Sequence, residues 1–432
     1  MSQPKHPSYR SIAVAACFGT FLEWYDFLTF GSLATIFGTL FFPSDDPVAG
    51  LLASLATFGI GMVIRPVGAA VFGSIGDRRG RRFSFIATIA LMGGATFAVG
   101  LLPTHAQAGL AAPLLLVAVR MLQGLAMGGE IGGAIVYLTE HAPPAKRGLY
   151  TSILQLMGPL GVMASTMQIT LLQSHLSHED FLDWGWRVPF LVSIVLLAVS
   201  LKSRMALHES PVFLELRAKN RLAAAPLRDC LRDPFTRQRM IVLFCCISAG
   251  GSLLFFSSQV YAGVFMKTVA GVDPVVAGHL TLIATLALFP LTIICGGLSD
   301  RIGRRPVLLA GLLLGAVGLF PVFAGLRDFA AEPASLVALL LVPILAVAMI
   351  TGPQTAAVAE LFPARSRYSA VALPHNLAAG WIGGMSPFMV TWIGRQFGDP
   401  LAGMLYPVVL LGLGAAIAWR FLPETRGRDL ND

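Results

Sequence analysis

Apolar residues fill most of this 432-residue chain in long blocks separated by short polar turns. A helix of about twenty apolar residues crosses the ~30 Å hydrocarbon core of a membrane. Most blocks lack the period-2 alternation of a transmembrane β-strand, so the pattern predicts helices. We expect twelve helices, near residues 11–41, 48–73, 83–103, 110–140, 148–172, 187–207, 240–262, 276–298, 306–326, 335–360, 368–394 and 402–422.

The composition is that of a protein embedded in lipid. Charged residues make up only 12% of the chain, against about 25% in a soluble domain. We expect no cleavable signal peptide, because no cleavage-site pattern follows the N-terminus. The cysteines lack metal-ligand spacing, so we expect no disulfide, metal or cofactor. The sequence shows no catalytic triad and no ATP-binding module, which argues against an enzyme and favours secondary transport.

Basic residues lie almost entirely on one side of the predicted membrane, and the loop 202–239 is especially rich in them. Such an asymmetry predicts that this loop and both termini are cytoplasmic. The loop can also lie on anionic lipid. The net charge of +8 therefore reflects topology and does not indicate a nucleic-acid partner. Six of the 31 basic residues are exceptions: Arg65, Arg120 and Arg187 in or beside spans, and Lys267, Arg327 and Arg395 on the opposite side.

The sequence repeats itself after six helices. GSIGDRRGRR (73–82) recurs as GGLSDRIGRR (296–305), and EHAPPAKR (140–147) corresponds to ELFPARSR (360–367). Repeated halves are the mark of a duplicated transporter, with its binding site at their interface. We expect an all-α membrane protein of two pseudo-symmetric six-helix bundles, residues 1–201 and 240–432, joined by the loop 202–239.

The repeated GxxxDRxGRR turn resembles the signature of the major facilitator superfamily. Within it, the chain is similar to the metabolite:proton symporter family, which includes citrate, α-ketoglutarate, shikimate and proline/betaine carriers. The stretches that carry this resemblance are FLEWYDF (21–27), IRPVGAAVFGSIGDRRGRR (64–82), RMLQGLAMGGEIGGA (120–134), DWGWRVPF (183–190) and HESPVF (208–213). The resemblance implies alternating access and proton-coupled import of a small metabolite.

The two repeated turns also have a purely structural interpretation, as helix caps and topology-setting charges. The resemblance implies instead a cytoplasmic gate, in which acidic and basic side chains bridge neighbouring helices. The residues concerned are Gly73, Asp77, Arg78, Gly80, Arg81, Asp300, Arg301, Gly303 and Arg304.

Arg65 is a charge deep within the second predicted span, where an arginine costs about 2.5–3.5 kcal/mol on insertion scales. It can be one half of a buried ion pair with Glu23 or Asp26. It can equally be an anchor for an anion, because a guanidinium binds a carboxylate through two parallel hydrogen bonds. The two roles can alternate during one transport cycle.

Glu23 and Asp26 share one face of the first helix, three residues apart. Two close carboxylates in a poorly solvated site should not both be ionised, so they are candidates for proton coupling, together with Glu130. The alternative is a permanent ion pair that only locks packing. Arg120 begins an RxxQG step that resembles the arginine motif near the protonation site of proton-coupled carriers, and a structural ion pair is its alternative. Arg187 can belong to an entry site for anions or pair with Asp183.

The second half has few buried charges, and its polar side chains suit the uncharged parts of a solute. We therefore place the acid group of the solute in the first half. His375 can titrate near neutral pH or serve only in packing. The further candidate substrate-binding residues are Gln155 in the first half and Gln259, Tyr261, Gln354 and Asn376 in the second.

Together these features predict a monomeric carrier in the inner membrane that imports a small organic anion, such as citrate or α-ketoglutarate, with protons. A carrier of zwitterionic osmolytes is one alternative, although the osmosensing members it would resemble have a long C-terminal coiled coil that this sequence lacks. A drug:proton antiporter is another, because GPLG (158–161) partly matches that group's GPxxGG step.

Overall fold

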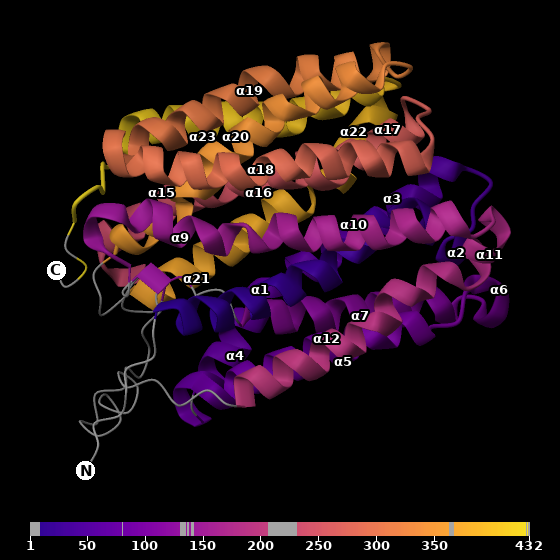
Figure 1. Ribbon diagram of the computed structural model, residues 1–432, viewed down its shortest axis with the longest axis horizontal. Coiled ribbons are helices and arrows are strands. Elements are labelled where there is room, and N and C mark those ends of the chain that lie inside the picture. The colour runs from indigo at the N-terminus through magenta and orange to yellow at the C-terminus, as the bar shows by residue number, and fades with distance from the viewer. Residues whose placement is uncertain are drawn as a thin grey trace.

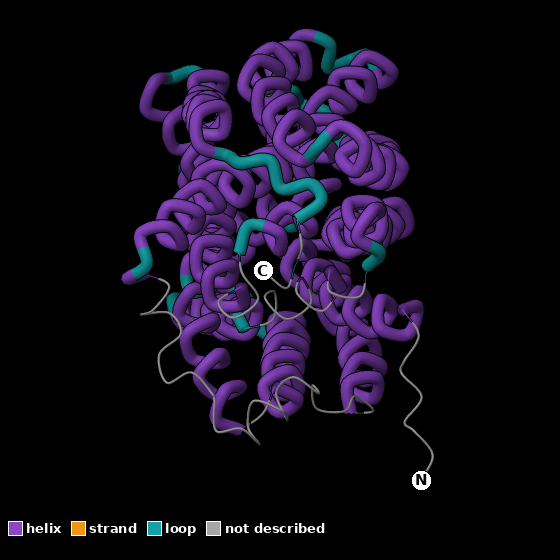
Figure 2. Tube along the Cα trace, turned by 90° about the vertical axis from the view of Figure 1, so that its left-hand side faces the viewer, coloured by secondary structure: helices purple, strands orange, loops and turns teal. Residues whose placement is uncertain are grey.

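The computed structural model describes residues 9–79, 81–129, 135, 138, 139, 142–205, 231–362, 367–428 and 430. In this part of the chain every regular element is a helix (Figures 1 and 2). Eight of the described helices are long and apolar enough to cross a membrane. The predicted all-α membrane fold is confirmed.

The first half contains six membrane segments, several of them divided into shorter helices. Its elements are α1 (Tyr9–Ser32), α2 (Ala34–Phe41), α3 (Pro47–Val63), α4 (Arg65–Arg79), α5 (Arg81–Leu101), α6 (His105–Ala108), α7 (Ala111–Gly128), η1 (Pro144–Lys146), α9 (Arg147–Gln155), α10 (Met157–His175), α11 (His178–Asp183), η2 (Gly185–Arg187) and α12 (Val188–Met205).

The second half also contains six segments, and five of these are candidate membrane spans among the described residues. Its elements are α15 (Pro234–Val242), η3 (Leu243–Ser248), α16 (Ala249–Phe256), η4 (Ser257–Tyr261), α17 (Ala262–Thr268), α18 (Pro274–Ile302), α19 (Arg304–Asp328), α20 (Pro333–Glu360), α21 (Arg367–Leu377), η5 (Ala378–Gly384), α22 (Ser386–Phe397), η6 (Pro400–Met404) and α23 (Leu405–Phe421).

The two halves lie side by side with their helices nearly parallel (Figure 1). In the first half α5 packs against α7 and α12, and in the second half α20 packs against α18 and α19. Helix α10 lies between the halves, because it packs against both α1 and α18. The exact bounds of the two bundles stay a prediction, since residues 206–230 of the joining loop lie outside the described part.

The second span, predicted for 48–73, extends from Pro47 to Phe72 but is interrupted at one residue. Helix α3 ends at Val63 and α4 begins at Arg65. Pro66 causes the break, because it has no N–H to donate to the carbonyl four residues earlier. The break places Arg65 at the first position of a new helix, in the interior of the membrane span.

The seventh span is longer than the predicted 240–262 and contains two π-helical segments, η3 and η4. The eleventh span contains a third, η5. A π-helical turn widens the backbone and is frequent at functional sites. The apolar pattern cannot reveal these segments, because they share no hydrophobic pattern of their own: η3 (LFCCIS) is apolar, whereas η4 (SSQVY) is largely polar.

Candidate functional site

Arg65 is completely buried, with 0% of its surface exposed. Its Nη1 atom lies 3.4 Å from the sulfur of Met62, which is only a weak acceptor. Within the described residues, Nε and Nη2 have no hydrogen-bond partner. Buried polar groups are almost always hydrogen-bonded, so these two unsatisfied donors are unusual.

Groups from both halves surround Arg65. Glu23 on α1 interacts with it electrostatically, and so does His375 on α21 of the second half. The Nδ1 atom of His375 lies 3.0 Å from the Oγ atom of Ser248 on η3. Arg65 therefore lies at the interface of the two halves, beside an acid of its own half.

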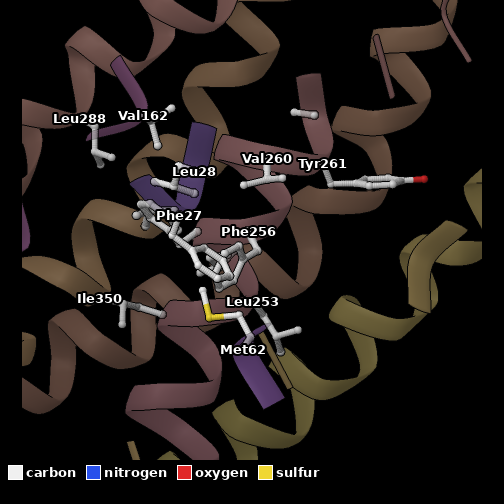
Figure 3. Packing of buried hydrophobic residues seen from close by; sticks show 14 of the residues in the cluster. Phe27, Leu28, Met62, Val162, Leu253, Phe256, Val260, Tyr261, Leu288 and Ile350 are labelled. Carbon is white, nitrogen blue, oxygen red and sulfur yellow. The ribbon is translucent and has the colours of Figure 1, made fainter. Parts of the chain in front are cut away.

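The break before Arg65 is held by the second half. The carbonyl of Val63 accepts a hydrogen bond of 3.1 Å from Nε1 of Trp381 on η5. Figure 3 shows the side chain of Met62 beside Phe256 and Leu253, which belong to α16. Any movement of the second half against the first must therefore change the surroundings of Arg65.

Arg120 on α7 is also 0% exposed, but its environment differs. Its guanidinium carbon lies 4.2 Å from the ring centre of Phe27 and 4.3 Å from that of Phe30. Such cation–π contacts stabilise a desolvated arginine by about 2 kcal/mol or more. Aromatic rings thus cover Arg120, whose Nε and Nη2 also have no hydrogen-bond partner within the described residues.

A chain of polar contacts leads from Arg120 to Asp26. Nη1 of Arg120 donates to Oε1 of Gln123 over 2.6 Å, and Nε2 of Gln123 donates to Oγ1 of Thr96 over 2.7 Å. Thr96 interacts in turn with Asp26, which also interacts electrostatically with Arg120. The sequence left the partners of the two acids open. In the structure Asp26 interacts electrostatically with Arg120, and Glu23 with Arg65.

A narrow pocket reaches both acids from the side of α5 and α12. Its lining residues are Leu22, Glu23, Asp26, Ile89, Met92, Gly93, Ser193 and Leu197. All of them belong to the first half, whereas Arg65 faces the second. The two carboxylates therefore lie between this pocket and the interface of the halves.

Arg187 lies apart from these residues, at the end of α5. It donates to the carbonyls of Gly100 and Leu102, over 3.2 and 2.6 Å. A cation is favourable at the C-terminus of a helix because it complements the free carbonyls. Asp183 also interacts with it electrostatically. These contacts account for Arg187 without a solute.

The predicted polar residues of the interior fall into two groups. Gln155 and Asn376 bridge the halves: Gln155 donates to Thr355 over 2.8 Å, and Asn376 donates to the carbonyl of Gly128 over 3.4 Å. The others lie mainly within the second half. Gln259 accepts from Thr285, Gln354 is buried near Gly251, and the ring of Tyr261 stacks on Phe323.

The repeated turn of the second half forms a dense ionic network. Nε and Nη2 of Arg304 donate to the two carboxylate oxygens of Glu360 over 3.2 and 3.1 Å, and Nη1 donates to Asp300 over 2.6 Å. Asp300 also accepts from the backbone N–H groups of Gly148 and Leu149. Asp300 thus caps the start of α9 and joins the second half to the first.

The other members of the two turns are only partly described. Gly303 has a φ of +107°, a conformation that requires glycine, and Arg301 is exposed. In the first turn the backbone of Gly73, Asp77 and Arg78 belongs to α4 and that of Arg81 to α5, but their side chains lie outside the described part. Glu130 and Gly80 lie outside it entirely.

A family model described as "Sugar (and other) transporter" matches residues 12–240 and 226–432. The chain belongs to this family of the major facilitator superfamily. Its members are membrane transporters and not enzymes. The resemblance noted from the repeated turns is therefore confirmed.

The alignments with three relatives cover nearly the whole of this chain. The inner membrane metabolite transport protein YhjE of Escherichia coli is 36% identical, over 98% of this chain and 96% of its own. The citrate-proton symporter of Salmonella typhi is 32% identical, over 95% and 93%. The proline/betaine transporter of Salmonella typhimurium is 31% identical, over 98% and 85%.

A solved structure of the Escherichia coli xylose transporter XylE, in a partially occluded inward-open conformation, has the same fold. The TM-score is 0.77, and the alignment covers 98% of this chain and 99% of that one. The sequences are only 19% identical, so this similarity bears on the fold alone. It supports the twelve-helix arrangement of a multi-pass membrane protein.

Sequence reasoning missed the uncharged members of the site. Phe27, Phe30 and Thr96 resemble ordinary lipid-facing or packing residues in the sequence, and only the fold brings them to Arg120 and Asp26. Glu360 was detectable, because it occupies the same step as Glu140 in the two related stretches ELFPARSR and EHAPPAKR. The structure makes it the central acid of the ionic network.

Proposed function

We propose that this transporter imports a small organic anion, a di- or tricarboxylate such as citrate or α-ketoglutarate, together with protons. The observation that carries the proposal is the state of Arg65. It is completely buried, has two nitrogens without a hydrogen-bond partner among the described residues, and lies where the halves meet.

A carboxylate would satisfy the free donors of Arg65. Hydrogen bonds between a guanidinium and a carboxylate contribute about 1.5–3 kcal/mol each. When no solute is bound, Glu23 on α1 can neutralise the charge in part. A solute that approaches Arg65 competes with Glu23, and the binding of the solute therefore affects the nearest proton acceptor.

Proton coupling is assigned to the two acids of α1. Asp26 lies beside Arg120 and Thr96, and the pocket between α5 and α12 gives both acids access to water-sized molecules. Protonation of either acid would free the partner arginine from its electrostatic partner. Proton binding and anion binding would thus favour each other, as symport requires.

Alternating access requires that contacts between the halves open and close. Gln155–Thr355 and Asn376–Gly128 cross the interface in the interior, and Asp300 crosses it at the start of α9. We assign the end that contains Asp300, together with the termini and the basic loop, to the cytoplasm. Its network then acts as the inner gate.

Uptake into proteoliposomes tests the proposal. The solutes are citrate, α-ketoglutarate, itaconate, shikimate, benzoate and betaine, each with and without an inward proton gradient. The proposal predicts accumulation of at least one di- or tricarboxylate, and a protonophore should abolish it. If no organic acid enters, or if a protonophore has no effect on accumulation, the proposal is wrong.

A zwitterionic solute is the second candidate, favoured by the similarity to the proline/betaine transporter. A betaine carries one carboxylate, which can bind Arg65, and a quaternary ammonium group. Aromatic rings recognise such cations, and Trp24 and Phe255 lie at the interface with ring centres 5.2 Å apart. Accumulation of betaine in the same panel, without uptake of citrate or α-ketoglutarate, would decide for this candidate.

A further inference from the structure

A second pocket lies between the halves, toward the end opposite the ionic network. Four membrane segments contribute to it, two from each half. Its lining residues are Gly31, Ser32, Thr35, Thr166, Ile169, Thr170, Gln173, Gln259, Val260, Gly263, Val264, Lys267, Pro274, Ala277, Gly278 and Thr281. The lining thus combines apolar residues and glycines with several hydroxyl and amide side chains and a single basic side chain, Lys267.

Lys267 on α17 is the charged residue of this pocket, and it is half-buried. Within the described residues, no ion pair or hydrogen bond of its ammonium group is present. The other basic side chains at this end have partners: Arg395 pairs with Asp46, and Arg327 pairs with Asp328. Because a charge that is partly removed from water is costly unless it is paired, the pocket favours a negatively charged occupant.

The neutral lining can also donate hydrogen bonds to such an occupant. Gln259 lines the pocket, and its carbonyl oxygen accepts from Thr285 over 2.8 Å, which leaves the donors of its amide N–H₂ group for another acceptor. Thr35, Thr166 and Thr170 supply hydroxyl groups at the facing wall. One cation surrounded by neutral donors suits a carboxylate on a polar solute better than an apolar ligand.

This pocket is distinct from the Arg65 site. Ser248, which contacts His375 beside Arg65, and Lys267 belong to the same span and are separated by 19 residues. At a rise of 1.5 Å per residue, this corresponds to roughly 28 Å along the helix. A single small solute cannot bind both groups at once.

We propose that Lys267 and the hydroxyl and amide groups around it form an outer binding site for carboxylates, which the solute occupies before it reaches Arg65. The inference rests on the proposed function, because it takes the solute to be an organic anion. Lys267 then contributes to capture from the outside. Its charge acts on the apparent affinity for external solute more than on the maximal rate.

Transport kinetics test the proposal with Lys267→Gln in proteoliposomes and α-ketoglutarate or citrate as the external solute. Loss of one charge-assisted hydrogen bond should raise KM about tenfold with a maximal rate close to that of the wild type. Lys267→Arg, which keeps the charge, should restore KM. Arg327→Gln is the matched control, because it removes a charge at the same end but from an exposed pair.

The proposal is overturned if Lys267→Gln leaves KM unchanged, or if Arg327→Gln raises KM equally, since a general surface potential would then explain the effect. Binding is tested separately by NMR of dimethylated lysines, with the resonance of Lys267 identified by its loss in Lys267→Gln. Citrate should shift this resonance in the wild type and also in Arg65→Ala, whereas chloride at equal ionic strength should not. No citrate-specific shift would contradict the outer site.

The NMR arm also separates the two proposals. A citrate-dependent shift in a protein that accumulates no organic acid would retain the outer site and reject the proposed function. Uptake that depends on Arg65 but not on Lys267 would retain the proposed function and reject the outer site.

Discussion

Arg65 in the first half and Arg304 in the second are both almost completely buried, yet their surroundings are opposite. All three nitrogens of Arg304 donate to Glu360, Asp300 or Ser299. Arg65 has one weak contact with a sulfur atom and two nitrogens without a partner within the described residues. The two arginines therefore contribute to different properties of the transporter.

A satisfied buried ion pair stabilises one arrangement of helices, because removal of one partner leaves an uncompensated charge. A buried charge without a full set of partners is costly in the protein that holds no ligand. Its free energy falls most when a ligand of opposite charge binds. We therefore propose that Arg304 contributes to stability and gating, and that Arg65 binds the solute. Substitutions that change solute binding but not stability, or stability but not binding, test this comparison of the two arginines.

The largest effect is expected from Arg65→Ala. Loss of two charge-assisted hydrogen bonds to the solute should reduce the initial rate of uptake about 100-fold or more. The melting temperature should change little, because removal of a poorly satisfied charge offsets the loss of its electrostatic interaction with Glu23. Uptake into proteoliposomes and thermal unfolding of the purified protein measure the two quantities. A large fall in melting temperature would show that Arg65 is a structural residue.

Arg304→Ala should give the reverse result. Removal of one partner from a buried ion pair costs about 3–5 kcal/mol, so the melting temperature should fall clearly, while affinity for the solute should change little. Arg327→Ala is the matched control, since exposed pairs contribute only about 0–1 kcal/mol. Equal melting temperatures for the two variants would contradict the structural role of the network.

Asp26→Asn tests the coupling within the first half. The amide cannot take up and release a proton, so the variant should exchange labelled solute across the membrane but no longer accumulate it against a gradient. Glu23→Gln is the companion variant, because the structure gives the two acids different arginine partners. If both single variants still accumulate solute, protons are carried elsewhere.

The smallest effect is expected from Arg395→Gln, which breaks the exposed pair between Arg395 and Asp46 at the end opposite the network. Since such a pair contributes about 0.2–1 kcal/mol, opening at this end should increase by a factor of about 1.4–5. The alkylation rate of a cysteine introduced at Thr35 in the outer pocket reports this opening. An unchanged alkylation rate would show that this pair does not hold the halves together at the end opposite the network.

Much of the fold followed from the sequence, because apolar blocks and repeated turns determine helix number and symmetry. Arg65, Asp26 and Arg120 were also accessible, since a charge inside an apolar block requires a reason. The partners of these charged residues could not be predicted. Phe30, Thr96 and Met62 reach them through tertiary contacts, which leave no pattern in the sequence. The sequence indicated the break at Ile64 only through the tendency of Pro66 to interrupt a helix. It gave no indication of the π-helical segments.

The most direct test of the central claim is equilibrium binding of radiolabelled citrate and α-ketoglutarate to purified wild-type protein, Arg65→Ala and Arg327→Ala. Binding requires no movement of the halves and no proton gradient, so it isolates the role of the buried guanidinium. We predict saturable binding of at least one acid to the wild type and to Arg327→Ala, and none to Arg65→Ala. Equal affinity of the wild type and Arg65→Ala would contradict the account.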